Sequence, residues 1–308
     1  MPISHRLLAA LVAVLWGVNF LAIHASLQHF PPLFLVALRF ALIAIPTVLL
    51  IPRPAVELRW LIGYGVGFGT LQFLFLYWGM AAGMPAGLAS LVLQSSAPFT
   101  VLLGAVVFGD RVTRRQLTGL LIASAGLAVV GWQRAEAASL LPFLLVLAGG
   151  FGWAIGNLAN ARAQAPNPLH LTLWMSVVPP IPMLALSLLV EGPGEIAASL
   201  TSWGAASAAP ALVGLGYTIL LGTLAGSGIW TWLMARHPAG VVAPFSMLVP
   251  VVGMTTAWLV LDETVSTGEL FGAGVVVLGV LLGSRLPRPS PADPRAAADR
   301  DPELSTGR

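Results

Sequence analysis

Ten apolar runs, each about as long as one membrane-spanning helix, fill most of the sequence. An α-helix needs about 20 residues to cross about 30 Å of hydrocarbon, and these runs contain almost no charge. Charged residues make up 9% of the 308 residues, where a soluble domain would carry about a quarter. The chain is therefore predicted to be an all-α polytopic membrane protein with ten transmembrane helices. The expected spans are 7–26, 32–51, 60–82, 85–108, 116–133, 140–162, 168–190, 209–234, 239–261 and 268–285.

The pattern of the runs disfavours an outer-membrane barrel and a cleaved signal peptide. The runs are continuous, whereas an outer-membrane barrel would show short segments of alternating character. The first run resembles a signal peptide, with His5 and Arg6 ahead of it, but no convincing small-x-small cleavage site follows. Trp16 and Asn19 within this run also have counterparts later in the chain. Residues 1–25 are therefore counted as the first helix.

Residue types that hold metals or perform catalysis are missing or scattered. The chain has no cysteine, and its five histidines show no metal-ligand spacing. We therefore expect no cofactor. Neither G-x-S-x-G nor H-E-x-x-H occurs and no acidic residue lies in mid-span, so an intramembrane enzyme is disfavoured.

The arginines predict how the chain lies in the membrane. There is no lysine, and with ten spans both termini share one side. Thirteen of the 15 arginines fall on that side, only Arg134 falls on the other, and Arg39 lies inside the second span. By the positive-inside rule both termini are cytoplasmic. The spread of these arginines over separate loops also explains the pI of about 10.2 without a nucleic-acid partner.

The sequence repeats itself at a constant offset of 153 residues. Pro-Ala-Gly occurs at 85–87 and again at 238–240, and residues 61–126 share 14 identities with the segment 153 positions later. Five of these identities are glycines, which mark close backbone approach or special dihedral angles. The expected units are 1–134, a first five-helix repeat; 135–286, a second five-helix repeat; and 287–308, a Pro- and charge-rich tail predicted to be disordered and cytoplasmic.

Five helices are an odd number, so the second repeat enters the membrane from the opposite side. The arginines agree, because "GDRVTRRQ" after the fourth helix carries three arginines and its counterpart "DETVSTGE" carries none. An inverted repeat is a signature of secondary transporters, in which two similar halves expose one central site alternately. The architecture therefore indicates transport.

Several motifs occur in the order expected of one family. "WGVNF" in the first helix, "LRF" in the second, "GMPAGLASLVLQ" and "VAPFSMLVPVVG" resemble the EamA-type drug/metabolite transporter superfamily. Within it the chain is similar to bacterial exporters of O-acetylserine and cysteine. The resemblance implies a bacterial inner-membrane exporter of a small-molecule substrate, with a cavity between the halves and the fifth and tenth helices at the periphery. Other amino acids, nucleobases, cationic drugs or lipid flipping remain open, as does a homodimer.

Polar residues at mid-span are candidates for the substrate site, because polar groups are costly in hydrocarbon unless partnered. Asn19 and Asn157 occupy near-corresponding places beside Trp16 and Trp153. An amide offers donors and acceptors that suit the ammonium and carboxylate of a zwitterion. The alternative is ordinary hydrogen bonding between helices.

The third and eighth helices add Gln72, which lies midway along its span, with Tyr77 and Trp230. Gln72 is expected to line the cavity. The aromatic residues are ambiguous, because tryptophan and tyrosine near the end of a span often anchor the protein at the membrane interface.

The fourth and ninth helices carry polar residues beside prolines. Gln94 and Ser95 precede Pro98, and Ser246 precedes Pro250. Because proline frees the carbonyl group four residues earlier, both helices are predicted to break near the substrate. The alternative is a packing kink satisfied locally.

Arg39 is the only basic residue well inside a span. It could bind a substrate carboxylate, form a structural pair, or extend to the bilayer surface. The corresponding residue of the second repeat is Met175, so the fold does not require the charge. Because no acidic residue lies in mid-span, the hypothesis is facilitated export, or coupling through groups not identified in the sequence.

Overall fold

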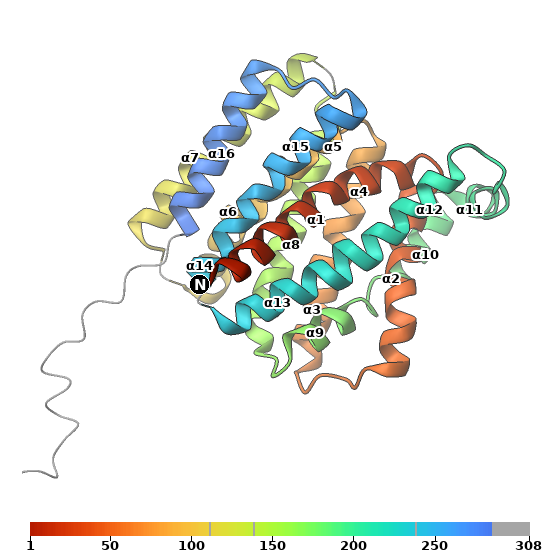
Figure 1. Ribbon diagram of the computed structural model, residues 1–308, viewed down its shortest axis with the longest axis horizontal. Helices are drawn as coiled ribbons and strands as arrows, with labels where there is room; N and C mark the ends of the chain where they lie inside the picture. Colours follow the sequence, from red (N-terminus) through yellow and green to blue (C-terminus); the bar gives the residue numbers. More distant parts are fainter. Residues whose placement is uncertain (111, 138, 238, 285–308) are drawn as a thin grey trace, which may run out of the picture.

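The computed structural model describes residues 1–110, 112–137, 139–237 and 239–284, and within them it contains helices and no strands (Figure 1). Nine helical spans in these ranges are long and apolar enough to cross a membrane, and a tenth apolar helix, Thr267–Gly283, is shorter. The all-α, ten-span prediction is confirmed. The predicted disordered tail, 287–308, lies outside the described residues.

Each predicted span corresponds to one or more helical segments. They are α1 (Ile3–Leu27), α2 (Pro32–Leu50), α3 (Leu58–Tyr64) with η1 (Gly65–Leu71) and α4 (Gln72–Ala81), α5 (Ala86–Val92) with η2 (Leu93–Ser95) and α6 (Ser96–Phe108), α7 (Arg114–Ala137), α8 (Leu141–Ala163), α9 (Pro168–Met175) with α10 (Pro180–Val190), α12 (Ala208–Tyr217) with η3 (Thr218–Ala225) and α13 (Gly226–Arg236), α14 (Ala239–Val242) with η4 (Ala243–Met247) and α15 (Leu248–Leu261), and α16 (Thr267–Ser284).

Successive spans run in alternating directions between two faces of the bundle. We call the face that holds the N-terminus the near face and the opposite face the far face; in Figure 1 they lie along the lower left and the upper right. The turn that contains the first Pro-Ala-Gly motif is at the far face. Gly83 there has a φ of 104°, which favours glycine, and α5 starts directly after Pro85. A tight hairpin therefore joins the third and fourth spans at this motif.

The helices pack in two units that each mix the two repeats. In the unit that we name the α1 unit, α1 packs against the eighth and ninth spans, 208–236 and 239–261. In the α8 unit, α8 packs against the third and fourth spans, 58–81 and 86–108. Glycines allow this close packing: a Cβ at Gly17 of α1 would lie 2.6 Å from the side chain of Val252.

The four spans that α1 and α8 contact are irregular at mid-span. The third and eighth contain π-helical segments, η1 and η3, at corresponding positions. In each a threonine hydroxyl donates to the carbonyl five residues earlier, Thr70 to Gly65 at 3.2 Å and Thr223 to Thr218 at 2.9 Å. The fourth and ninth spans contain 3₁₀ segments, η2 and η4, close to the predicted breaks. Such segments often mark functional positions.

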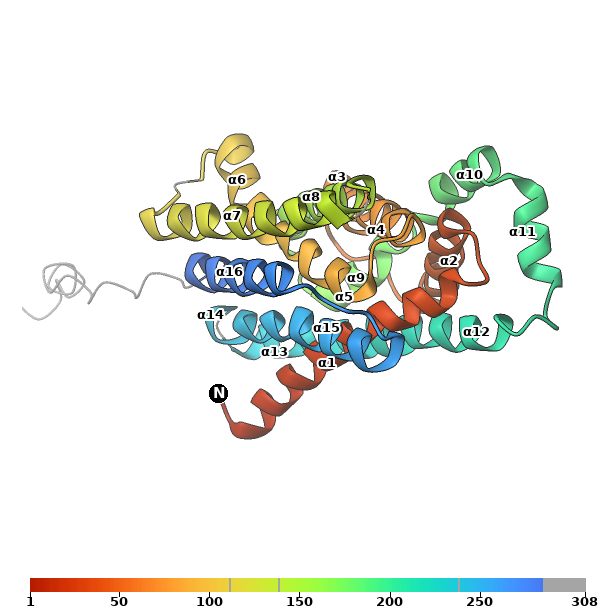
Figure 2. The ribbon, with the colours of Figure 1, turned by 90° about the horizontal axis from the view of Figure 1, so that it is seen from above.

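Two features differ from the sequence-based expectation. The span 168–190 is broken at 176–179, because Pro179 has no N–H for helical bonding and restricts the residue before it. An additional helix, α11 (Gly192–Thr201), follows this span at the far face (Figure 2). At 10 residues it is too short to span a membrane.

The fifth and tenth spans form a separate pair at one edge of the bundle (Figure 1). α7 and α16 pack along most of their length. Glycines of both helices meet in this contact, and a Cβ at Gly126 would lie 2.7 Å from the backbone nitrogen of Val276. This is the small-residue packing by which helices associate in lipid.

Candidate functional site

Arg39 of α2 is almost completely buried, at 4% exposure, and its side chain turns into the protein. One terminal nitrogen of the guanidinium donates to the Tyr77 hydroxyl and the other to the Thr223 hydroxyl, both at 2.9 Å. The guanidinium carbon also lies 4.0 Å from the centre of the Phe73 ring, a cation–π contact. Arg39 thus joins three helices instead of extending to the bilayer surface.

The fourth and ninth spans meet at Gln94, which is buried. Its amide nitrogen lies 3.8 Å from the sulfur of Met247 in η4. A thioether is a weak acceptor, so this contact satisfies the amide poorly. Ser246, the neighbour of Met247, is half-buried.

Trp16 and Trp153, the predicted counterparts, have different surroundings. The Trp16 indole donates to the Gly222 carbonyl at 2.9 Å, and its ring lies 5.2 Å from that of Trp230. Trp153 is half-buried and meets the Phe68 ring edge-on at 6.0 Å. The structure therefore places both tryptophans against π-helical segments, but only Trp16 has its N–H bonded to one.

The two predicted asparagines also differ. Asn157 donates to the Thr100 hydroxyl at 3.1 Å, which is a hydrogen bond between α8 and α6. Asn19 is buried beside Gly222, and its side-chain oxygen has no hydrogen-bond partner. Asn157 thus makes the helix-to-helix contact that was the alternative, while Asn19 keeps a free acceptor.

Gln72 and Ser95 are both buried in the α8 unit with oxygen atoms that have no hydrogen-bond partner. Each lies against a glycine of α8, Gln72 near Gly149 and Ser95 near Gly150. Buried polar atoms without a partner are uncommon in proteins, and each needs a physical reason. Asn19, Gln72 and Ser95 therefore hold unused hydrogen-bonding capacity close to the helix irregularities.

Two acidic residues at helix ends, which no sequence pattern singles out, hold the far face together. Glu263 accepts hydrogen bonds from the backbone N–H groups of Ala86 and Gly87 at 2.7 and 2.9 Å. Glu191 accepts in the same way from Leu33 and Phe34 at 2.6 and 3.0 Å. Carboxylates at helix N-termini are favoured by the helix dipole and by the free N–H groups there. The bond between Glu263 and α5 joins the α1 unit to the α8 unit, and we call it the far-face contact.

α5 also packs against α15 next to the far-face contact. Towards the near face the same two spans diverge, and Figure 2 shows α6 and α14 well apart. α6 packs on α8 and α7 instead. The fourth and ninth spans are thus joined at the far face and diverge towards the near face.

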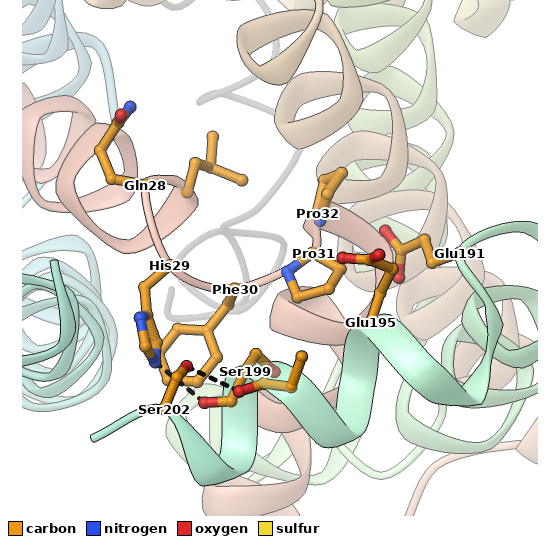
Figure 3. Close-up of a pocket in the computed structure, with 11 residues that line it drawn as sticks. Gln28, His29, Phe30, Pro31, Pro32, Glu191, Glu195, Ser199 and Ser202 are labelled. Atoms are coloured by element: carbon orange, nitrogen blue, oxygen red, sulfur yellow. Dashed lines mark hydrogen bonds between the residues drawn. The ribbon is translucent and has the colours of Figure 1, made fainter. Parts of the chain in front are cut away.

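A cavity of about 440 Å³ lies at the far face between the loop after α1 and helix α11. In Figure 3 Glu191 and Glu195 lie together at one end of it, beside Pro31, and His29 lies at the other. His29 Nε2 is 2.9 Å from the Ser199 carbonyl oxygen. None of the predicted site residues lines this cavity.

At the near face, His5 and His237 form a pair in which Nδ1 of His5 lies 2.6 Å from Nε2 of His237. Burial lowers the pKa of His237 from its ordinary value, and the positive charges of His5, the N-terminus and Arg236 lower it further. In the ranges that the structure describes, no three acidic or histidine side chains gather as a metal site.

Comparisons with known proteins agree with this architecture. The model of the EamA-like transporter family matches residues 4–132 and 140–285. A probable amino-acid metabolite efflux pump of Salmonella typhimurium is 40% identical over 281 residues, covering 89% of this chain and 93% of the relative. Its Escherichia coli counterpart, under the same description, is 39% identical over the same length.

Two more distant similarities were also found. A probable terminal-alkyne amino-acid exporter of Streptantibioticus cattleyicolor is 28% identical over 223 residues, or 71% of this chain and 70% of the relative. A crystal structure with 18% identity superposes with a TM-score of 0.57 and covers 92% of this chain and 96% of that one. At that identity the likeness supports the fold alone.

Proposed function

Because the chain belongs to the EamA-like transporter family, we propose that it exports a small amino-acid metabolite, such as cysteine or O-acetylserine, from the bacterial cytoplasm by alternating access. The near face, where the N-terminus and most of the described arginines lie, is the cytoplasmic face in this proposal. The present conformation is then open towards the cytoplasm and closed by the far-face contact.

The observation that carries the proposal is the set of buried oxygens without hydrogen-bond partners at mid-span. Asn19 contributes one from the α1 unit, and Gln72 contributes one from the α8 unit. Amide oxygens are hydrogen-bond acceptors, and an ammonium group offers three donors. In this proposal the two oxygens accept from a substrate ammonium that lies between the two units, one oxygen from each unit.

The remaining candidates have supporting roles in this proposal. Gln94 supplies an amide where the two broken helices meet. Ser95 follows Gln94 in η2, and Ser246 precedes its contact partner Met247 in η4. Trp16, Trp153 and Trp230 provide aromatic side chains next to the π-helical segments. Asn157 holds α8 to α6 through Thr100. The broken helices allow each unit to change shape near the substrate without losing the packing of its other half.

The test is transport by the purified chain in proteoliposomes loaded with radiolabelled cysteine, O-acetylserine, other amino acids or a cationic drug. Efflux of the amino-acid metabolites in preference to the drug is expected. Asn19→Ala and Gln72→Ala should each slow efflux about tenfold, the value of one hydrogen bond to a charged group. Asn160→Ala, at an exposed site on α8, is the matched control. Efflux that is unchanged in both variants would refute the site, and efflux of the drug alone would refute the substrate class.

Energy coupling is measured in the same vesicles. Because the spans carry no acidic residue at mid-span, we propose export down the substrate gradient without a proton relay. Efflux rates should be equal with and without a pH gradient. A strong dependence on that gradient would overturn this part of the proposal.

A further inference from the structure

We propose that Arg39 binds the carboxylate of the transported substrate, and that in the present conformation the Thr223 hydroxyl occupies the place of that carboxylate. This inference rests on the proposed export function and names the chemical class of its substrate: an anion or zwitterion with a free carboxylate. It also predicts at which stage of the cycle the carboxylate is bound.

Arg39 carries a charge without a counter-charge. The guanidinium stays protonated in proteins, and in the described part of the chain none of the ion pairs includes it. Both residues that accept its hydrogen bonds, Tyr77 and Thr223, are neutral, and its Nε atom is buried with no partner. An arginine inside a membrane span is normally paired or functional. Among the described residues, no carboxylate pairs with Arg39.

The guanidinium is also held in a geometry that suits a carboxylate. Arg39 has five N–H donors, and two carry hydrogen bonds to side chains. The Phe73 and Phe40 rings lie 4.0 and 5.0 Å from its central carbon and hold the side chain in position. A planar guanidinium binds a carboxylate through two parallel hydrogen bonds, and such charge-assisted bonds are roughly twice as strong as those to a neutral acceptor. A carboxylate would therefore displace a hydroxyl from Arg39.

Thr223 can leave Arg39 when the two units separate. Arg39 and Tyr77 lie on the second and third spans, whereas Thr223 lies in η3 of the α1 unit. The Thr223 hydroxyl donates its proton to the Thr218 carbonyl and only accepts from Arg39. Opening of the far face would break the hydrogen bond from Arg39 to the Thr223 hydroxyl. The hydrogen bond from that hydroxyl to the Thr218 carbonyl would remain. The vacated N–H group would then bind the substrate carboxylate as the substrate moves outward.

The second repeat shows that the charge is not needed for folding. Met175 corresponds to Arg39, and it is fully buried beside Gly69, the neighbour of Thr70. Thr70 donates to a carbonyl five residues earlier, as Thr223 does. The fold therefore tolerates a methionine at this position without disturbing the π-helical segment. Arg39→Met is accordingly the variant that removes the charge with the least risk to folding.

The experiment measures binding to the purified chain in detergent by thermal stabilisation. The ligands are cysteine and O-acetylserine, each compared with its carboxyl methyl ester, and acetate compared with acetamide. The wild type should bind each carboxylate at least about tenfold more tightly than its analogue without a carboxylate. Arg39→Met should melt near the wild-type temperature and bind both members of each pair equally. Thr223→Val, which removes the competing hydroxyl, should keep the preference. Arg59→Met, at an exposed arginine, is the control.

The outcomes separate this inference from the proposed function. A carboxylate preference that survives in Arg39→Met overturns the inference, as does equal loss of acid and ester binding, which would mean a structural role. If the amino acids do not bind but acetate stabilises the wild type and not Arg39→Met, the substrate is wrong and the anion site stands. If no carboxylate stabilises the wild type more than its analogue without a carboxylate, the anion site is refuted.

Discussion

Gln94 contacts Met247, the residue that occupies its own position 153 residues later in the second repeat. Two equivalent residues of an inverted repeat can touch only where the pseudo-two-fold axis passes between them. The axis therefore runs between the fourth and ninth spans, at their 3₁₀ segments. A substrate on this axis would meet equivalent helices from both repeats.

The first prediction concerns the amide on the axis. Gln94→Leu should slow efflux from proteoliposomes by about tenfold or more, because a hydrogen bond to a charged group contributes about 1.5–3 kcal/mol. Met247→Leu conserves volume and should stay within about twofold of the wild type. Equal effects of the two substitutions would mean that Gln94 serves packing alone.

The second prediction concerns the far-face contact. Glu263→Ala leaves the N–H groups of Ala86 and Gly87 without their acceptor, which costs about 0.5–2 kcal/mol at a helix N-terminus. The far face should then open more often. Because the chain has no cysteine, a single cysteine at Ser90, which is buried at 1% exposure beside Gly253, reports this opening through its rate of maleimide labelling.

Labelling of Ser90→Cys should be about two- to thirtyfold faster in the Glu263→Ala background, in proportion to that free energy. Asp262→Asn removes the neighbouring charge and keeps a residue that tolerates the positive φ of 53° found there. This control should label at the parental rate. Identical rates in all three proteins would show that the contact does not limit opening.

The third prediction concerns pH. The pKa of His237 lies below its ordinary value of 6.5 in the folded chain, so the unfolded chain binds more protons between the two pKa values. The contribution of His237 to the free energy of unfolding is complete above pH 6.5 and is lost as the pH falls towards the folded pKa. Melting temperatures at pH 5.5 and 7.5 should differ in the wild type and differ less in His237→Gln. A variant with the full wild-type difference would exclude His237 as its source; His170→Gln is the control.

The fourth prediction concerns the edge pair of helices. A Cβ at Gly279 of α16 would overlap the backbone of Ala123 in α7, whereas one at Gly274 would meet nothing within 4 Å. Gly279→Ala should destabilise the protein by about 1–3 kcal/mol through overpacking. Gly274→Ala should leave the melting temperature unchanged within a degree or two. Equal melting temperatures for the two variants would contradict the close contact of α7 and α16.

Much of the fold could be predicted from the sequence because it depends on sequence features that are local or periodic. Apolar runs set the number of spans, and the prolines near Gln94 and Ser246 indicated the broken helices. The packing of α1 against the eighth and ninth spans, and of α8 against the third and fourth, could not be predicted. The order of spans along the chain does not determine which spans become neighbours. The break at 176–179 and the short helix α11 were missed because length and hydropathy averaged over 20 residues conceal both.

For a related reason, only some of the residues described at the site could be predicted from the sequence. Arg39 is conspicuous in an apolar helix, and Tyr77 is a polar aromatic residue inside a span. Thr223 resembles any threonine in a membrane helix, and only the structure shows that it accepts from Arg39. Glu191 and Glu263 lie at helix ends where acidic residues are common. Their partners are the backbone N–H groups of distant segments, which no pattern of side chains reveals.

The mixed composition of the two packing units has a consequence for how the protein is made. α1 is synthesised first, yet its neighbours in the α1 unit are the eighth and ninth spans, more than 180 residues later. The first helix must therefore wait in the bilayer until the ribosome has delivered nearly the whole chain. A gene split between the repeats would yield two fragments that each lack a complete unit. Such fragments should persist in the cell only when they are produced together.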